Sequence, residues 1–264
     1  MAVTSRGLDA LANRLTRGPW QWPLARSESG RRHLAAAGAD SVVIEIIGPA
    51  GAGKSTLVAR LEHLLRRQGT EVVAHRAIGF VDPDGRPESK VRRRANQALS
   101  LLSNPRLVLW CWRYGRSTLD SKTLVAMCVR ARFAKRLRRR PGIHLLDEGP
   151  LRIAPVLFAH AQGRGPELLA FLPLPQLVVA LTVDPDVPVE RVQARPVGTI
   201  SSAAALERLR SANRLHTSAL ETIQQTVPAI QLDTTRGEDH TAAARDWILS
   251  QLRRRPDADS GAGR

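Results

Sequence analysis

The chain has 264 residues, and its 40 Lys and Arg against 24 Asp and Glu give a formal net charge of +16. With 43% hydrophobic and 24% charged residues, the composition excludes a disordered chain, a collagen-like repeat and a coiled coil. Basic residues occur along the whole chain and only four of them are lysines, so we interpret most of the charge as a compositional preference for arginine. The alternative is a phosphate-rich partner, because a guanidinium group binds phosphate through two hydrogen bonds.

Two further features favour a cytoplasmic protein. Cys111 and Cys128 belong to no CxxC motif and no Cys/His ligand cluster, which fits a reducing compartment. No stretch reaches about 18 apolar residues, and the N-terminus lacks the apolar core of a signal peptide. We therefore expect neither a transmembrane segment nor a secreted, disulfide-linked domain.

Residues 1–40 are expected to form an extension outside the main domain. Leu8, Leu11 and Leu15 share one helical face beside basic residues, with two tryptophans following, a pattern that a helix on a membrane surface also shows. Because this apolar stripe is short, we favour a helix packed on the domain or a mobile leader. Residues 254–264 are expected to form a disordered polar tail.

Between these ends, over residues 41–253, apolar runs typical of strands alternate with helical patterns. Strands are predicted at 42–47, 71–75, 143–146, 176–183 and 229–233. After the first strand, a helix with an apolar face is predicted up to Gly69, and later helices at 89–140 (with breaks near Asn104 and Gly115), 186–194, 203–225 and 240–253. This alternation predicts a three-layer α/β fold with a parallel sheet covered on both faces.

The strongest motif is a phosphate-binding loop between the first strand and the first helix. It reads Gly48-Pro49-Ala50-Gly51-Ala52-Gly53-Lys54-Ser55, a full match to G-x-x-x-x-G-K-[ST]. Glycines let the backbone point its N–H groups at an anion, and the helix N-terminus adds its positive dipole end. We expect Lys54 to reach the β- and γ-phosphates of ATP, Ser55 to bind Mg²⁺ and Thr56 to contact the α-phosphate. Nucleotide binding follows, but kinases, ATPases and GTPases share this loop.

Two carboxylates follow the third predicted strand, at the sheet edge where open α/β folds bind ligands. Asp147 is a candidate Mg²⁺ ligand of the Walker B type. Glu148 could accept a proton from an acceptor hydroxyl or polarise a water molecule. Alternatively, the two carboxylates have no role in the site and occur there because the positive dipole end of a following helix favours negative charge. Arg152 could bind an anionic acceptor or pair with Glu148.

Arg191 and Arg195, after the fourth predicted strand, lie four residues apart and therefore share one helix face. They could close over a transferring γ-phosphoryl group and stabilise its charge. They could equally be two exposed arginines in an arginine-rich chain.

The order of four segments resembles the thymidylate-kinase-like branch of the P-loop nucleoside and nucleotide kinases. The segments are GPAGAGKST, LLDEGP, LTVDPDVPVERVQAR and IQLDTTRGEDHTAAARDWIL. The resemblance implies a five-stranded parallel sheet of order 2-3-1-4-5 and the use of ATP with Mg²⁺. It also implies a lid near residues 186–202 that carries Arg191 and Arg195.

The same resemblance implies further site residues. Asp184 would close the fourth strand, and Arg76 would lie near the acceptor. Thr234, Thr235 and Arg236 would border the adenine of ATP.

The acceptor region departs from this family. Thymidylate kinases follow the third strand with an Asp-Arg pair and a helix rich in Ser and Tyr, whereas this chain has DEGPLR at residues 147–152. Aromatic residues are few, which leaves Phe80 as the best candidate to stack on a base. Phosphoryl transfer is therefore better supported than dTMP as the acceptor.

Two basic segments flank the expected acceptor region. Residues 92–94 and the basic positions of 130–140 could clamp an anionic acceptor, bind nucleic acid or form a solvated face. No aromatic residues alternate with the arginines as base stacking would need, so we favour the solvated face. His216 lies on the apolar side of its predicted helix, which favours a core histidine over a catalytic one.

Together, these features predict an ATP- and Mg²⁺-dependent small-molecule kinase. Its acceptor would be a nucleotide, a nucleoside or another small anionic or hydroxyl compound rather than a nucleic acid, and a homodimer stays open. One alternative is a P-loop ATPase that acts with a nucleic acid or another anionic polymer. Another is a nucleotide-binding regulatory protein without turnover.

Overall fold

The structure is a computed structural model that describes residues 41–76, 89–114, 121–160, 164–184, 186–187 and 203–254. Within them, five parallel strands form one sheet in the order β2-β3-β1-β4-β5, which confirms the predicted topology. The strands are β1 (Ser41–Ile47), β2 (Val72–His75), β3 (Gly142–Leu146), β4 (Leu177–Thr182) and β5 (Ala229–Asp233).

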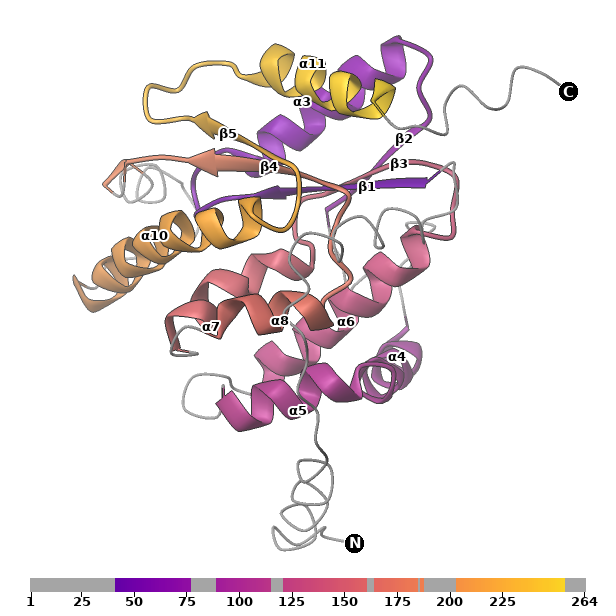
Figure 1. Cartoon of the computed structure of the whole chain (residues 1–264), viewed down its shortest axis with the longest axis vertical. Helices are drawn as coiled ribbons and strands as arrows, with labels where there is room; N and C mark the ends of the chain where they lie inside the picture. The colour runs from indigo at the N-terminus through magenta and orange to yellow at the C-terminus, as the bar shows by residue number, and fades with distance from the viewer. Residues whose placement is uncertain are drawn as a thin grey trace, which may run out of the picture.

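Helices cover both faces of the sheet (Figure 1). On one face lie α3 (Lys54–Arg67) and α11 (Thr241–Arg253). On the other lie α6 (Ser121–Leu137), α7 (Ala154–His160), α8 (Gly165–Phe171) and α10 (Ala203–Gln224). Farther from the sheet, α4 (Lys90–Leu102) and α5 (Pro105–Tyr114) pack against α6. The three-layer α/β fold is therefore confirmed, with α4 and α5 added at one end.

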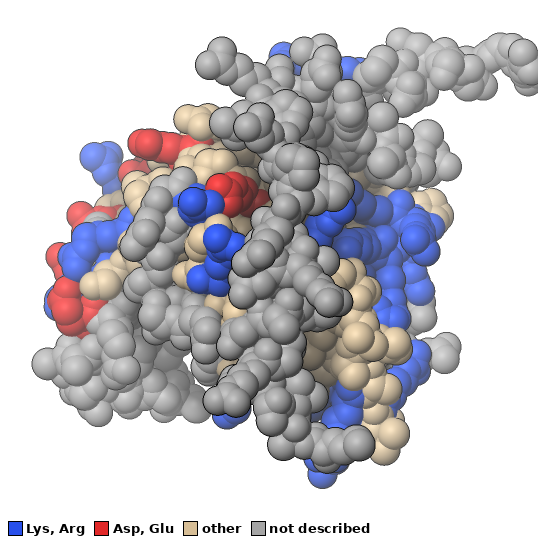
Figure 2. Space-filling view, turned by 60° about the horizontal axis from the view of Figure 1, so that its bottom comes forward, with Lys and Arg blue, Asp and Glu red and all other residues tan. Residues whose placement is uncertain are grey.

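The net positive charge is concentrated in one part of the chain, between Glu88 and Asp147. Fifteen of the 40 Lys and Arg, but only one of the 24 Asp and Glu, lie between Ser89 and Leu146. This segment therefore carries +14 of the formal +16, because acids are nearly missing from it. It spans α4, α5, α6 and β3, and Figure 2 shows basic side chains gathered on the side where α4 lies, at the right of the view.

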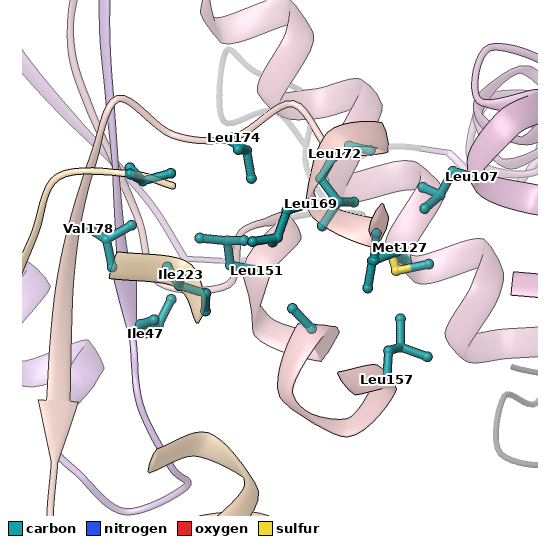
Figure 3. Close-up of a cluster of buried hydrophobic side chains, with 14 of the residues drawn as sticks. Ile47, Leu107, Met127, Leu151, Leu157, Leu169, Leu172, Leu174, Val178 and Ile223 are labelled. Atoms are coloured by element: carbon teal, nitrogen blue, oxygen red, sulfur yellow. The ribbon is translucent and has the colours of Figure 1, made fainter. Parts of the chain in front are cut away.

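The central strand β1 is buried along its whole length because it has a strand on each side and helices on each face. Its side chains alternate between the two faces, as the pleat of a strand requires. Val42, Ile44 and Ile46 join the cluster against α3 and α11. Ile47 joins the cluster on the opposite face (Figure 3), with members such as Val178, Met127, Leu157, Leu169 and Ile223.

The break predicted near Asn104 is present, and a buried amide side chain fixes it. The side-chain Nδ2 of Asn104, which is 4% exposed, donates to the carbonyl oxygen of Ser100 at 2.7 Å. Pro105 then starts α5, where its missing N–H is not needed. In contrast, α7 and α8 were not predicted, because each has only seven residues and Gly165-Pro166 interrupts the helical pattern.

Several predicted regions lie outside the described residues. They are the extension 1–40, most of the lid at 186–202 and all but the first residue of the tail at 254–264. Within the described part of the chain, no helix combines the length and apolar character needed to span a bilayer.

A buried histidine pair between the sheet and α6 predicts loss of stability in acid. His75 Nε2 lies 3.3 Å from His144 Nδ1, and the His75 ring packs edge-on against Phe133. Burial, with smaller contributions from the charges of His144 and Arg140, lowers the pKa of His75 from 6.5 to about 4. The unfolded chain then binds more protons below pH 6.5, so this contribution to stability is complete above pH 6.5 and is lost as pH falls through 4.

We expect His75→Gln to flatten the decline of the unfolding free energy between pH 6.5 and 4. The wild-type loss assignable to this residue is up to about 3 kcal/mol. Urea titrations at several pH values measure it, with the exposed His63→Gln as the matched control. An unchanged pH slope in His75→Gln would contradict the prediction.

Candidate nucleotide-binding site

The phosphate loop joins β1 to α3, and its geometry depends on glycine. Gly53 precedes α3 with a φ of +91°, a conformation that residues with a side chain rarely adopt. A Cβ atom at Gly48 would lie 2.7 Å from the carbonyl oxygen of Leu181, so a side chain there would push the loop away from β4. Among the described residues, no side chain caps α3, as expected for a helix start that binds an anion.

Three polar side chains meet at the start of α3. Lys54 Nζ donates to the carbonyl oxygens of Gly48 at 2.9 Å and Pro49 at 2.7 Å, so the ammonium group lies across the loop. Ser55 Oγ donates to Asp147 Oδ2 at 2.5 Å. This contact brings together the hydroxyl and the carboxylate that the two motifs separately indicate as Mg²⁺ ligands.

Asp147 reaches Ser55 because β3 lies directly beside β1. The parallel register pairs Glu45 with Leu146, so both strands end at the same edge of the sheet. The backbone N–H of Asp147 also donates to the carbonyl oxygen of His75 at 3.3 Å. The carboxylate is therefore positioned from β1 and from β2, and the residue is only 7% exposed.

Glu148 points into a pair of arginines on the other side of the same loop. Arg130 of α6 donates from Nη2 to Glu148 Oε2 at 3.1 Å and from Nε to the Glu148 carbonyl oxygen at 3.2 Å. Arg152 forms an ion pair with Glu148 Oε1. The solvated face predicted for this basic segment is wrong for Arg130, because its side chain is 11% exposed and is directed inward by α6. For Arg152, the structure shows the ion pair with Glu148, which was one of the two alternatives, and binding of an acceptor stays a prediction.

A buried carboxyl group that the sequence analysis missed lies beneath this loop. Glu45 of β1 is fully buried, and its Oε1 accepts the backbone N–H of Leu151 at 2.9 Å. Its Oε2 has no hydrogen-bond partner among the described residues. Burial raises the pKa of Glu45 to about 8, although the Leu151 hydrogen bond and the charge of Arg130 lower it. The group is therefore mainly neutral at pH 7 and ties the 147–152 loop to the sheet.

His216 lies closer to the phosphate loop than the sequence analysis expected. It is half-buried and lines a small depression together with Gly48, Pro49 and Thr182. Burial lowers its pKa to about 4, and the positive charges of Lys54 and Arg152 lower it further. Its neighbours Leu220 and Ile223 do enter the core, but α10 reaches the edge of the phosphate loop one turn earlier. His216 is thus a neutral group beside the loop rather than a core histidine.

The loop between β5 and α11 lies beside the phosphate loop. Thr234 Oγ1 donates to the carbonyl oxygen of Ala52 at 3.2 Å. Thr235 Oγ1 accepts the backbone N–H of Asp184 at 3.0 Å, which links this loop to the end of β4. Arg236 follows in an exposed turn. This placement puts Thr234 and Thr235 next to the expected nucleotide position, whereas no contact of Arg236 with the phosphate loop is seen among the described residues.

The acceptor candidates are only partly brought together. Arg76 forms an ion pair with Glu62 of α3 at 3.0 Å, on the side of β2 that faces α3. Phe80 lies outside the described residues, as do the lid arginines Arg191 and Arg195. Of the predicted acceptor groups, the described part of the chain places Arg152 at the carboxylate edge of the site.

Sheet order, phosphate loop and the adjoining acidic loop together define a three-layer α/β fold of the P-loop class. No protein-family model and no curated protein matches the sequence. Among solved structures, the chain is similar to a deoxyadenosine kinase from M. mycoides with bound dATP, with 13% identity, a TM-score of 0.43, and coverage of 80% of this chain and 100% of that one. It is also similar to a shikimate kinase from Acinetobacter baumannii in complex with shikimate, with 16% identity, a TM-score of 0.42, and coverage of 83% and 98%.

The contact between Gly149 and Glu45 predicts a steric effect of a single methyl group. A Cβ atom at Gly149 would lie 2.6 Å from Glu45 Oε1, while the backbone, with φ of −82°, suits alanine. Gly149→Ala is therefore expected to lower the unfolding free energy by about 1–3 kcal/mol through overpacking. Urea titration should show a much smaller loss in a Glu45→Ala background. Equal losses in both backgrounds would mean that this contact is not the cause.

Proposed function

We propose that this protein is an ATP- and Mg²⁺-dependent phosphotransferase that acts on a small acceptor. The observation that carries the proposal is the 2.5 Å contact between Ser55 Oγ and Asp147 Oδ2 beside Lys54. Hydroxyl and carboxylate oxygens suit Mg²⁺, which usually takes few protein ligands and completes its shell with water and phosphate oxygens. The residues present therefore fit a Mg²⁺–ATP complex on the phosphate loop.

Bound Mg²⁺ would neutralise charge on the β- and γ-phosphates as the γ-phosphoryl group leaves ADP. Groups of the chain would bind the phosphates and the metal on this side of the site. The amides at the start of α3 would hold the phosphates, and Lys54 would leave the Gly48 and Pro49 carbonyls to reach them. Ser55 and Asp147 would hold the metal.

On the acceptor side, we propose that Glu148 handles the proton. When an acceptor hydroxyl attacks the γ-phosphorus, its oxygen forms the new P–O bond, the bond to the leaving ADP oxygen breaks, and the proton goes to the Glu148 carboxylate. Arg130 and Arg152 hold both carboxylate oxygens, which fixes their direction. A phosphate-monoester acceptor needs no strong base, and Glu148 would then only position it.

Within the P-loop kinases, we propose the thymidylate-kinase-like branch. The order of the motifs supports it, and the β5–α11 loop beside Ala52 fits an adenine-bordering role for Thr234 and Thr235. The lid arginines Arg191 and Arg195, the base-stacking role of Phe80 and the role of Arg236 stay predictions. So does the cytoplasmic location.

One experiment separates transfer from hydrolysis. The protein is incubated with γ-labelled ATP, Mg²⁺ and pools of nucleosides, nucleotides and sugars, with and without RNA or DNA. A labelled small-molecule product, abolished by EDTA, is the expected result. Phosphate release that is stimulated by the polymer, without labelled product, would instead establish the ATPase alternative.

Removing either proposed metal ligand should slow turnover more than it weakens nucleotide binding. We expect Ser55→Ala and Asp147→Asn each to lower kcat about a hundredfold, because charge on the transferred group is no longer balanced. Asp246→Asn on the exposed surface of α11 is the matched control and should leave kcat unchanged. A normal kcat in Asp147→Asn at saturating Mg²⁺ would remove the metal assignment.

Lys54→Ala tests the phosphate loop itself. Loss of the ammonium group should weaken ATP affinity about tenfold or more, since that charge faces the β- and γ-phosphates. Calorimetric titration with a non-hydrolysable ATP analogue measures it, and the exposed Lys122→Ala serves as the control. Unchanged affinity in Lys54→Ala would mean that the nucleotide does not bind at this loop.

Glu148→Gln distinguishes a proton acceptor from a positioning group. With a hydroxyl acceptor, kcat should fall by about 10²–10⁴ while the KM for ATP stays the same. With a phosphate-monoester acceptor, the KM for the acceptor should rise instead. A variant with wild-type kcat and KM would exclude Glu148 from the reaction.

A further inference from the structure

Helix α4 is oriented with its polar side toward the protein and its apolar side outward. Its only fully buried residue is Ser100, and Leu101 is partly buried against the core cluster. Toward α6 it also makes a polar contact, in which Arg132 donates to the carbonyl oxygen of Asn96 at 3.4 Å. Three large apolar side chains of α4 are exposed instead: Val91 at 79%, Leu99 at 47% and Leu102 at 76%. This arrangement is the reverse of a helix that packs only on its own domain.

The exposed apolar residues form one continuous stripe. At 100° per residue, Val91, Ala95, Ala98, Leu99 and Leu102 fall within about a third of the helix circumference. Basic side chains lie on either side of this stripe, with Arg92 along one edge and Arg94 along the other, and both are exposed. The outer face of α4 therefore combines basic side chains in its first turns with apolar side chains that extend along its length. We call these residues the α4 face.

The surroundings of the α4 face are strongly positive. It belongs to the segment from Ser89 to Leu146, which has fifteen basic residues and one acidic residue. Figure 2, which brings this end of the molecule forward, shows basic side chains around a tan area on the right, and no acidic side chain of the described residues is visible there. A partner for this face must therefore be anionic and must also accept apolar side chains.

We propose that the α4 face binds the surface of a bilayer that contains anionic lipids. In such a surface, Val91, Leu99 and Leu102 enter the boundary between headgroups and acyl chains, while Arg92 and Arg94 lie among the anionic headgroups. A nucleic acid would satisfy the arginines but would leave the leucines without an apolar partner. This binding is separate from the proposed phosphoryl transfer and does not depend on it.

Charge disfavours the two other occupants that the chain itself offers. A second copy would bring two segments of +14 against each other. The extension 1–40 carries six arginines against three acids, so it too would be repelled by the arginine-lined stripe. An anionic bilayer is the partner for which both the charge and the apolar stripe are favourable.

The first test is sedimentation of the full chain with vesicles of phosphatidylcholine alone or mixed with phosphatidylserine. We expect binding only to the mixed vesicles, weakened at high salt. The double variants Arg92→Gln/Arg94→Gln and Leu99→Ser/Leu102→Ser should each weaken it about tenfold or more. The control Arg67→Gln/Arg253→Gln makes the same charge change on the α3–α11 side and should bind like wild type. All four leucine and arginine positions are exposed, so circular-dichroism melts should show folded variants.

A labelled variant reports contact directly. Both native cysteines are buried, and burial raises the pKa of Cys111 to about 12 and of Cys128 to about 11, so a polarity-sensitive thiol dye should label Leu102→Cys selectively. Its emission should shift to the blue with phosphatidylserine vesicles, whereas the same dye at His63→Cys on α3 should not respond.

Three results would overturn the proposal. The first is no binding to phosphatidylserine vesicles. The second is binding that both α4 double variants retain, which would assign the membrane contact to another segment such as 1–40. The third is binding to RNA or DNA that the arginine variant loses and the leucine variant keeps, without any vesicle binding, because it would identify a nucleic-acid surface.

Discussion

The site depends on the parallel pairing of β1 with β3. β1 leads into the phosphate loop and β3 leads into the acidic loop, and their register makes both strands end at one edge of the sheet. Ser55 and Asp147 lie 92 residues apart in the sequence, and this pairing brings the hydroxyl of one to the carboxylate of the other. The pairing is stabilised by burial rather than by the site itself, because β1 is covered on both faces and flanked by β3 and β4. A rigid core thus determines the position of this polar contact.

One buried residue of β1, Glu45, interrupts the apolar pattern of that strand. An ionised carboxylate is unfavourable at this buried position, and burial therefore raises the pKa of Glu45 to about 8, so that the group is mainly neutral near pH 7. What it gains is a fixed acceptor for the Leu151 N–H and a surface against which Gly149 packs. The loop that carries Asp147 and Glu148 is therefore attached to the most buried part of the sheet, although its backbone has little regular structure. A polar group in the core here positions the functional loop above it.

The sequence was sufficient for features that depend on neighbours in the chain. The phosphate loop, the ends of the five strands and the break at Asn104 all follow from local patterns of glycine, proline and apolar residues. It was insufficient for features that depend on side chains meeting across the fold. In the sequence, Arg130 does not differ from the other two arginines of α6, and only the fold directs it to Glu148. Likewise, the apolar face of its helix predicts that His216 points toward the protein. It does not predict that, at this turn of α10, the neighbouring segment is the phosphate loop.

The arginines of this chain fall into two groups that differ in their partners. Arg130 and Arg152 both pair with the Glu148 carboxylate, so they fix its position, and one of their two positive charges is balanced by it. The arginines at the start of α4 belong to the segment from Ser89 to Leu146, which has fifteen basic residues and one acidic residue, and they border apolar side chains that the fold leaves exposed. A random excess of arginine would have produced unbalanced positions throughout the molecule. Instead, the imbalance is largest in the segment that contains α4–α6, and this segment includes the one helix whose apolar side, among the described residues, faces away from the core. The proposed bilayer would account for both features, because its surface is anionic and its interior is apolar.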